Sequence, residues 1–220
     1  MAQLFQPRAN LIARGGILLA AILIATGTLA AYGYFRSSYV RGVEIPIDQP
    51  VPFSHAHHVA GLGIDCRYCH SSVETSDFAG MPSTQTCMNC HSQIWTNAEL
   101  LAPVRESWQT DQPIRWRRVT DVPDFVYFSH AIHIAKGIGC ETCHGRVDQM
   151  PLMQKAHPMY MSWCLECHRQ PQRYIRPREE VFTMGWQPPR GVDRQAYGQQ
   201  LVEQYNVQVQ GLTDCSICHR

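Results

Sequence analysis

Ten cysteines form the clearest chemical pattern in this chain of 220 residues. They occur as five pairs, each with two residues between the cysteines and a histidine directly after the second one. The five segments are named motifs 1 to 5 in chain order: Cys66–His70, Cys87–His91, Cys140–His144, Cys164–His168 and Cys215–His219. Because no cysteine lies outside these motifs, the function of the C-x-x-C-H unit must account for all ten cysteines.

The C-x-x-C-H spacing is the signature of covalent c-type haem attachment. Two thiols three residues apart reach the two vinyl groups of one porphyrin, and the next residue places an imidazole beneath the iron. Zinc sites also use C-x-x-C pairs, but they do not require histidine after every pair. A disulfide framework does not place every cysteine at one interval. The sequence therefore predicts five haem c groups, attached through Cys66, Cys69, Cys87, Cys90, Cys140, Cys143, Cys164, Cys167, Cys215 and Cys218, with proximal iron ligands His70, His91, His144, His168 and His219.

A repeated histidine pattern precedes motifs 1 and 3. Residues 53–60 (the first repeat) read F-S-H-A-H-H-V-A, and residues 128–135 (the second repeat) read F-S-H-A-I-H-I-A. Histidines three positions apart on a helical turn project to neighbouring faces, so one pair can reach two irons. His57 aligns with Ile132, which makes it a poor ligand candidate. We expect the distal iron ligands to be His55, His58, His130 and His133.

Four distal histidines cannot serve five irons. The fifth iron either stays open or takes a ligand from the residues that remain, of which the candidates are Met150, Met153, Met159, Met161, Met184 and His157. Methionine is a weaker donor than histidine, favours ferrous iron and raises the reduction potential. Most methionines fill cores, so no single one is favoured from the sequence.

The N-terminal region contains an apolar segment. The 21 residues from Gly15 to Phe35 carry no charge, and Arg14 and Arg36 bracket them. As a helix this segment is about 32 Å long, enough to cross the hydrocarbon core of a bilayer. A cleaved signal peptide is the alternative, with a small-residue cleavage site near Thr28–Ala30. The length of the apolar run favours an uncleaved membrane anchor.

The haem chemistry orients this anchor and divides the chain. Covalent haem attachment takes place outside the bacterial cytoplasm, so we expect a single-pass protein of the inner membrane with its haem domain on the periplasmic side. The predicted organisation is a cytoplasmic N-terminus (1–14), a transmembrane anchor (15–35) and an extracytoplasmic pentahaem domain (36–220). Within that domain we expect two di-haem units, 50–92 and 125–170, and a fifth haem in 171–220.

The composition predicts a mainly α fold with little regular structure. Fourteen prolines and fifteen glycines interrupt the chain. Apolar spacing favours one helix within 192–207 and another within 97–107, and no β-sheet domain is indicated. A net charge of +1 does not favour a nucleic-acid partner. Haem propionates are plausible partners for several of the arginines, namely Arg105, Arg115, Arg117, Arg118, Arg173, Arg176 and Arg178.

Two levels of resemblance follow from these motifs. The layout F-S-H-x-x-H followed by C-x-x-C-H resembles class III cytochromes c. With the apolar segment, two di-haem halves and a terminal motif, the chain resembles the pentahaem subunit of alternative complex III. The segments W-C-L-E-C-H (163–168), P-D-F-V-Y-F (123–128) and L-T-D-C (212–215) fit that subunit.

The resemblance implies a function. In that family a membrane complex oxidises quinol, and the haem subunit takes electrons from an iron–sulfur subunit beside integral membrane subunits. It passes them to a monohaem cytochrome, another periplasmic carrier or a terminal oxidase, and it is not catalytic alone. The resemblance also implies four bis-histidine haems and one methionine-ligated haem.

Three other functions compete with this reading. One is a stand-alone membrane-anchored quinol dehydrogenase that donates electrons to a periplasmic reductase. Another is a multihaem reductase, which needs one open iron to bind its substrate. A haem-stabilised scaffold without redox flux is the least favoured, because five haems exceed what a structural role requires.

Overall fold

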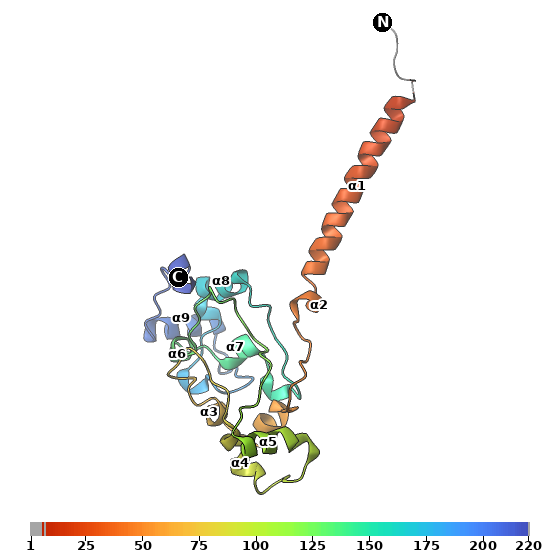
Figure 1. The fold of residues 1–220 in the computed structure, drawn as a ribbon. Coiled ribbons are helices and arrows are strands. Elements are labelled where there is room, and N and C mark those ends of the chain that lie inside the picture. Colours follow the sequence, from red (N-terminus) through yellow and green to blue (C-terminus); the bar gives the residue numbers. More distant parts are fainter. Residues whose placement is uncertain (1–5, 7, 220) are drawn as a thin grey trace. The chain divides into compact units, whose positions relative to one another are not determined.

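The computed structural model describes residues 6 and 8–219, and these are mainly helical (Figure 1). Within this described part there is no β-strand, and four isolated β-bridges join loop segments: Val43–Lys155, Pro46–Gln154, Val126–His219 and Ile138–Ile175. The predicted fold class, mainly α with little regular structure, is confirmed. The chain divides into two compact units, Met1–Gly42 and Val43–Arg220.

The first unit contains helices α1 (Ala9–Phe35) and α2 (Ser38–Arg41). Helix α1 has 27 residues, a mean hydropathy of 1.9 over its most apolar window and no buried residue. Its length and composition suffice to cross a membrane, and they also fit a signal sequence. The Ser37 hydroxyl caps α2 by accepting a hydrogen bond from the Val40 N–H, and Gly42 ends α2 in the left-handed conformation.

The second unit is built from short helices joined by loops. Its α-helices are α3 (Cys66–Cys69), α4 (Thr84–His91), α5 (Ala102–Thr110), α6 (His130–Ala135), α7 (Cys140–His144), α8 (Met161–Arg169), α9 (Arg194–Gln204) and α10 (Cys215–Cys218). A π-helix, η1 (Ala56–Gly61), and four 3-10 turns, η2 (Glu99–Leu101), η3 (Val147–Gln149), η4 (Pro171–Arg173) and η5 (Arg178–Glu180), complete it. The helices predicted within 97–107 and 192–207 are confirmed by η2 with α5 and by α9.

Each attachment motif lies on one of these helices. Motifs 1, 3 and 5 form α3, α7 and α10, and motifs 2 and 4 occupy the C-terminal parts of α4 and α8. Asp65 begins α3 by accepting a hydrogen bond from the Arg67 N–H. Because residues i and i+3 share one face of a helix, each helix presents its two thiols side by side.

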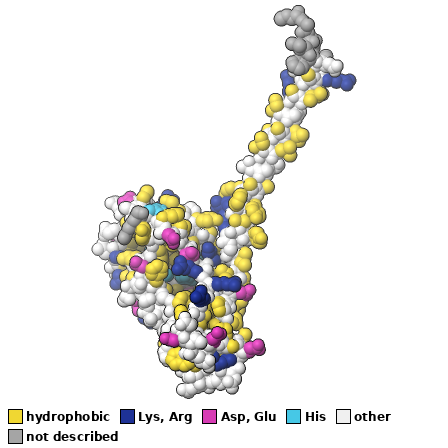
Figure 2. Space-filling view, viewed as in Figure 1, with side chains coloured by type: hydrophobic (Ala, Val, Ile, Leu, Met, Phe, Trp, Pro, Cys, Tyr) yellow, Lys and Arg dark blue, Asp and Glu magenta, His cyan; other side chains and the backbone are white. Residues whose placement is uncertain are grey.

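The protein core is too small for a unit of this size. Among the described residues only ten hydrophobic side chains are buried. Four of them, Ile175, Leu201, Val202 and Tyr205, form a cluster under α9. The whole chain exposes 15342 Å² for a mass of 25.0 kDa, and α1, in which no residue is buried, contributes part of this area. Hydrophobic side chains cover α1 and also reach the surface of the second unit (Figure 2). The exposed apolar surface of the second unit is what bound porphyrins would cover.

Candidate haem-binding sites

The structure brings three predicted distal histidines opposite three motif histidines. The ring centroids of His58 and His91 are 6.3 Å apart. Those of His130 and His144 are 6.2 Å apart, and so are those of His133 and His168. Motifs 2, 3 and 4 therefore each face one histidine of the two repeats.

This spacing fits an iron with two axial imidazoles. A bond between a metal and an imidazole nitrogen is about 2 Å long, and the ring centre lies about 1 Å beyond the nitrogen. Two imidazoles on opposite sides of one metal therefore have centroids about 6 Å apart. The three gaps have that size, so the residues present fit haem iron as the group held between them.

His55 lies near motif 1. Burial, and after it the positive charges of His70, His58 and His144, lower the pKa of His55 to about 4. Of these three charges, that of His70 in motif 1 has the largest effect. Among the described residues the buried Nδ1 of His55 has no hydrogen-bond partner.

Hydrogen bonds to backbone carbonyls orient most of these imidazoles. The motif histidines donate from Nδ1 as follows: His70 to Gly80 (2.8 Å), His91 to Ile94 (3.2 Å), His168 to Leu212 (2.9 Å) and His219 to Phe125 (3.1 Å). The repeat histidines do the same: His58 to Ser54 (2.8 Å), His130 to Asp77 (2.7 Å) and His133 to Ser129 (2.6 Å). A carbonyl only accepts, so Nδ1 carries the proton and the Nε2 lone pair is left for a metal.

One phenylalanine in each repeat holds both histidines. The Phe53 ring stacks on His58 at 4.3 Å and meets His55 edge-on at 4.9 Å. In the same way, Phe128 stacks on His133 at 4.5 Å and meets His130 edge-on at 4.9 Å. The two imidazoles of a repeat are thus held in different orientations, as ligands of two different irons must be.

His57 is not one of the histidines that face a motif histidine. Its side chain is exposed, stacks near Trp95 with ring centroids 6.3 Å apart and meets the His58 ring edge-on at 5.3 Å. Its exclusion from the ligands stays a prediction.

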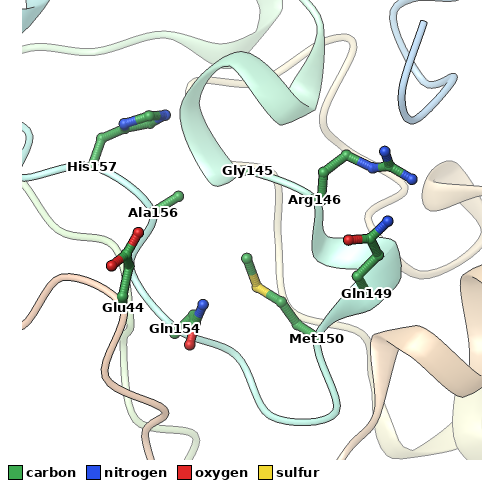
Figure 3. Close-up of a pocket in the computed structure, with 8 residues that line it drawn as sticks. All are labelled: Glu44, Gly145, Arg146, Gln149, Met150, Gln154, Ala156 and His157. Carbon is green, nitrogen blue, oxygen red and sulfur yellow. The ribbon is translucent and has the colours of Figure 1, made fainter.

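Two candidates for the fifth distal ligand, Met150 and His157, line a cavity beside motif 3 (Figure 3). The cavity has a volume of about 380 Å³ and is also lined by Glu44, Gly145, Arg146, Gln149, Gln154 and Ala156. Gly145 follows His144 directly and has a φ of 69°, and an added Cβ there would collide with Ala156. His157 stacks on Trp163 at 5.1 Å. Both candidates therefore belong to the surroundings of motif 3.

The remaining candidates separate into two places. Met153 accepts a backbone hydrogen bond from Ile47, and Met184 precedes Gly185, which bonds to Glu141 of motif 3. Met161 begins α8, one turn before Cys164. Burial raises the pKa of the Cys164 thiol, and the nearby Cys218 raises it further. Met161 therefore lies one helical turn before motif 4, whereas Met184 lies next to a residue that contacts motif 3.

Motif 5 is held by the segment that precedes the second repeat. The Tyr127 N–H donates to the Cys218 carbonyl at 2.8 Å, and Val126 forms a β-bridge with His219. The Phe125 ring stacks on His219 at 5.8 Å. A segment distant in sequence therefore fixes the fifth motif histidine.

A buried ion pair lies inside motif 3, and the sequence did not predict it. Glu141 accepts from the Arg176 guanidinium at 2.7 Å and from the Gly185 N–H at 2.5 Å. Arg176 is only 5% exposed. Arg176 was a predicted propionate partner, but the structure pairs it with a carboxylate of the chain itself. The sequence signal is weak: a glutamate between the two cysteines and an arginine 35 residues later.

The ten thiols are free; eight of these cysteines are half-buried, and Cys90 and Cys215 are exposed. Burial raises the pKa of Cys143 to about 12 and that of Cys167 to about 11.

The second half of the chain has recognisable relatives. Residues 126–220 match the family described as cytochrome c7 and related cytochrome c. This match includes the second repeat and motifs 3, 4 and 5. The cytochrome c7 match therefore covers the part of the chain that contains two of the three facing histidine pairs.

A curated protein is also similar. It is the menaquinone reductase, multiheme cytochrome c subunit, of Nitratidesulfovibrio vulgaris (strain Hildenborough), and it is 40% identical over 98 residues. The aligned part is 44% of this chain and 46% of the relative, so the chain spans about half the length of the protein it matches. Both comparisons support a multihaem cytochrome c that transfers electrons through covalently bound haem. The resemblance to alternative complex III stays a prediction.

Proposed function

We propose that this chain is a membrane-anchored five-haem cytochrome c that relays electrons within a quinone-linked membrane complex. The observation that carries the proposal is the set of three histidine pairs with centroids 6.2–6.3 Å apart. Each pair joins a histidine of a repeat to a histidine of an attachment motif. Two strong ligands on one iron leave no position for a substrate, which favours electron transfer over catalysis.

The residues of the chain have separate tasks in this function. The ten motif cysteines would hold the porphyrins, and the motif and repeat histidines would ligate the irons. The Nδ1 hydrogen bonds fix each imidazole and increase its basicity. When bound, the haems supply reversible one-electron chemistry, whose potential depends on the axial ligands and on burial.

For the fifth iron we propose Met161 as the distal ligand. Two observations support this proposal: Met161 lies one helical turn before Cys164, and the pKa of the Cys164 thiol is raised by the neighbouring Cys218 of motif 5. A methionine ligand raises the potential of its iron relative to histidine. If Met161 does not ligate, the iron of motif 5 is open, which is the condition for the multihaem reductase.

We propose that α1 is an uncleaved anchor in the bacterial inner membrane. Its 27 residues and mean hydropathy of 1.9 support a single span. Because haem is attached outside the cytoplasm, residues 43–220 belong on the periplasmic side.

We propose that the partners are those of a quinone oxidoreductase complex. The relative is named as a subunit of a menaquinone reductase, which supports electron exchange with membrane quinones. In this proposal, an iron–sulfur subunit and integral membrane subunits deliver electrons from quinol. A periplasmic cytochrome or a terminal oxidase accepts them. The relative is named for the reduction of menaquinone, which is the opposite direction of electron flow. The test therefore includes reduction of the haems by quinol.

The test is low-temperature EPR and a visible redox titration of the complex purified through this chain. We expect five low-spin haems, one of them at a distinctly higher potential, and haem reduction on addition of quinol. The variant His58→Gln should convert one iron to high spin, and the matched variant His57→Gln should not. A high-spin iron in the wild-type complex that binds cyanide would favour the reductase. Quinol oxidation by this chain in isolation would favour the stand-alone dehydrogenase.

A further inference from the structure

We propose that the five attachment motifs form one line in the order 2–1–3–4–5, so that motifs 2 and 5 are its ends and motifs 1 and 3 join its halves. The inference rests on the proposed electron relay and specifies its route. It differs from the order of the motifs in the sequence, in which motif 2 would join motif 3.

Motif 2 contacts motif 1. The Asn89 side chain, between the cysteines of motif 2, donates to the Tyr68 hydroxyl, between those of motif 1, at 3.1 Å. The distal histidines of these motifs, His55 and His58, come from the same repeat. On its other side α4 packs against α5, where the hydroxyls of Thr84 and Ser107 are 2.6 Å apart. Helix α5 carries no attachment motif, which makes motif 2 an end of the line.

Motif 1 contacts motif 3 through their first cysteines. The side chains of Cys66 and Cys140 lie beside each other, so porphyrins attached to them would be neighbours. Both motifs also hold the same short segment. Arg67 lies over the Phe182 ring at 4.5 Å, and the Cys140 N–H donates to the Val181 carbonyl at 3.1 Å.

A second connection joins motif 1 to the distal ligand of motif 3. His130 donates from Nδ1 to the Asp77 carbonyl at 2.7 Å, and the Ala131 N–H donates to the Ser76 carbonyl at 3.1 Å. Residues 76 and 77 follow motif 1 closely in the chain. The loop of motif 1 therefore positions the imidazole that faces His144.

Motifs 3 and 4 share helix α6. It supplies His130 opposite motif 3 and His133 opposite motif 4, and Phe128 contacts both rings. Distal ligands three residues apart place their two irons next to each other, as in the first repeat.

Motif 4 contacts motif 5. His168 donates from Nδ1 to the Leu212 carbonyl at 2.9 Å, and Leu212 lies three residues before Cys215. The other contacts of motif 5 are with residues 125–127, which lead into the second repeat. These contacts link motif 5 to the second half of the chain, which makes it the other end of the line.

The order has a functional consequence. Electron transfer rates fall steeply with the distance between donor and acceptor, so electrons move between neighbours. Every electron that crosses from one half to the other must then use motifs 1 and 3. Partner proteins must dock near motif 2 or motif 5.

The experiment is a double-mutant cycle on the midpoint potentials of the purified complex. His55→Met, His58→Met and His130→Met each replace one distal ligand, and methionine raises the potential of that iron. Neighbouring haems couple electrostatically, so the shifts of a neighbouring pair are not additive. We expect non-additive shifts for His55→Met combined with His130→Met, and additive shifts for His58→Met combined with His130→Met. The reverse result would establish the sequence order and overturn the proposal.

If a variant loses a haem, the wild-type complex itself provides a second measurement. In its cryo-EM map, the distance between the irons of motifs 1 and 3 should be shorter than the distance between the irons of motifs 2 and 3. The opposite order of distances overturns the inference. Failure of the proposed function is a separate result: quinol would leave all five haems oxidised while the order of the irons stood.

Discussion

The two histidine repeats have nearly the same sequence but different backbones. The first repeat continues as the π-helix η1, in which the Leu62 N–H reaches back to the His57 carbonyl, and the second repeat forms the α-helix α6. A π-helix has more residues per turn, which changes the angle between successive side chains. The planes of His58 and His91 cross at 67°, whereas those of the corresponding pair, His133 and His168, differ by 24°. The same histidine spacing thus produces two different arrangements of facing imidazoles.

The polar support of the two halves differs as well. His130 is oriented by the Asp77 carbonyl, while the buried Nδ1 of His55 has no partner within the described residues. Glu141 of motif 3 forms a buried pair with Arg176, whereas Arg67 of motif 1 pairs with Asp65, and these two side chains are 49% and 46% exposed. The second half is therefore stabilised more by its own buried polar contacts than the first half is.

The largest expected effect comes from removing a distal ligand in either repeat. We expect His55→Ala and His130→Ala each to convert one low-spin iron to high spin, because the remaining axial ligand is a single imidazole. The thioether bonds keep the haem attached, so the haem content of the complex should not change. EPR and visible spectra of the purified complex measure this conversion.

The matched control is His57→Ala, which should leave every iron low-spin. If the spectra of both repeat variants equal that of the wild type, these histidines are not ligands. If only the His130 variant responds, the second repeat alone supplies ligands and the likeness of the two repeats is misleading.

The next effect separates the halves by stability. Glu141→Gln leaves the buried Arg176 without a charged partner, which costs about 3–5 kcal/mol. The unfolding midpoint of the haem protein in guanidinium chloride should fall accordingly. Asp65→Asn is the control in motif 1, because asparagine also caps a helix and the pair is exposed to solvent. We expect no measurable change there, and equal losses in both variants would contradict the contrast between the halves.

A smaller effect concerns the orientation of the imidazoles. The angle between two axial ring planes sets the anisotropy of a low-spin ferric iron. Phe53→Leu and Phe128→Leu remove the flat rings that hold His58 and His133. We expect each variant to shift the EPR lines of its own two irons without producing high-spin iron. Phe78→Leu, at a side chain that is 71% exposed, should shift none, and shifts common to all three variants would mean a general loosening.

Local patterns were sufficient to predict part of this arrangement. The cysteines and motif histidines follow from spacing alone, since one helical turn sets the distance between the two thiols. The likeness of the two repeats selected four distal histidines, and the structure places three of them opposite motif histidines. The helix near residues 192–207 was predicted from the spacing of its apolar residues, which is also a pattern contained within one segment.

The other features depend on contacts between distant residues. The pair of Glu141 and Arg176 joins positions 35 residues apart, and the Asp77 carbonyl reaches His130 from 53 residues away. The π-helix of the first repeat could not be distinguished from an α-helix, because both fit histidines three residues apart. The assignment of each distal histidine to a motif required the tertiary fold.

The smallest expected effect is a loss of folding stability at acid pH, to which His55 of the first repeat contributes. Burial lowers the pKa of His55 to about 4, whereas His133, whose pKa burial also lowers, has an opposing hydrogen bond from Nδ1 to Ser129. Between pH 6.5 and about 4 the unfolded chain binds a proton that folded His55 does not, so stability is lost as the pH falls through this window and is constant above it. Iron ligation also favours the neutral imidazole, so the sign is unchanged. Unfolding midpoints measured from pH 8 to pH 4 should decline below 6.5. A flat profile would show that the burial of His55 does not control the acid stability of the protein.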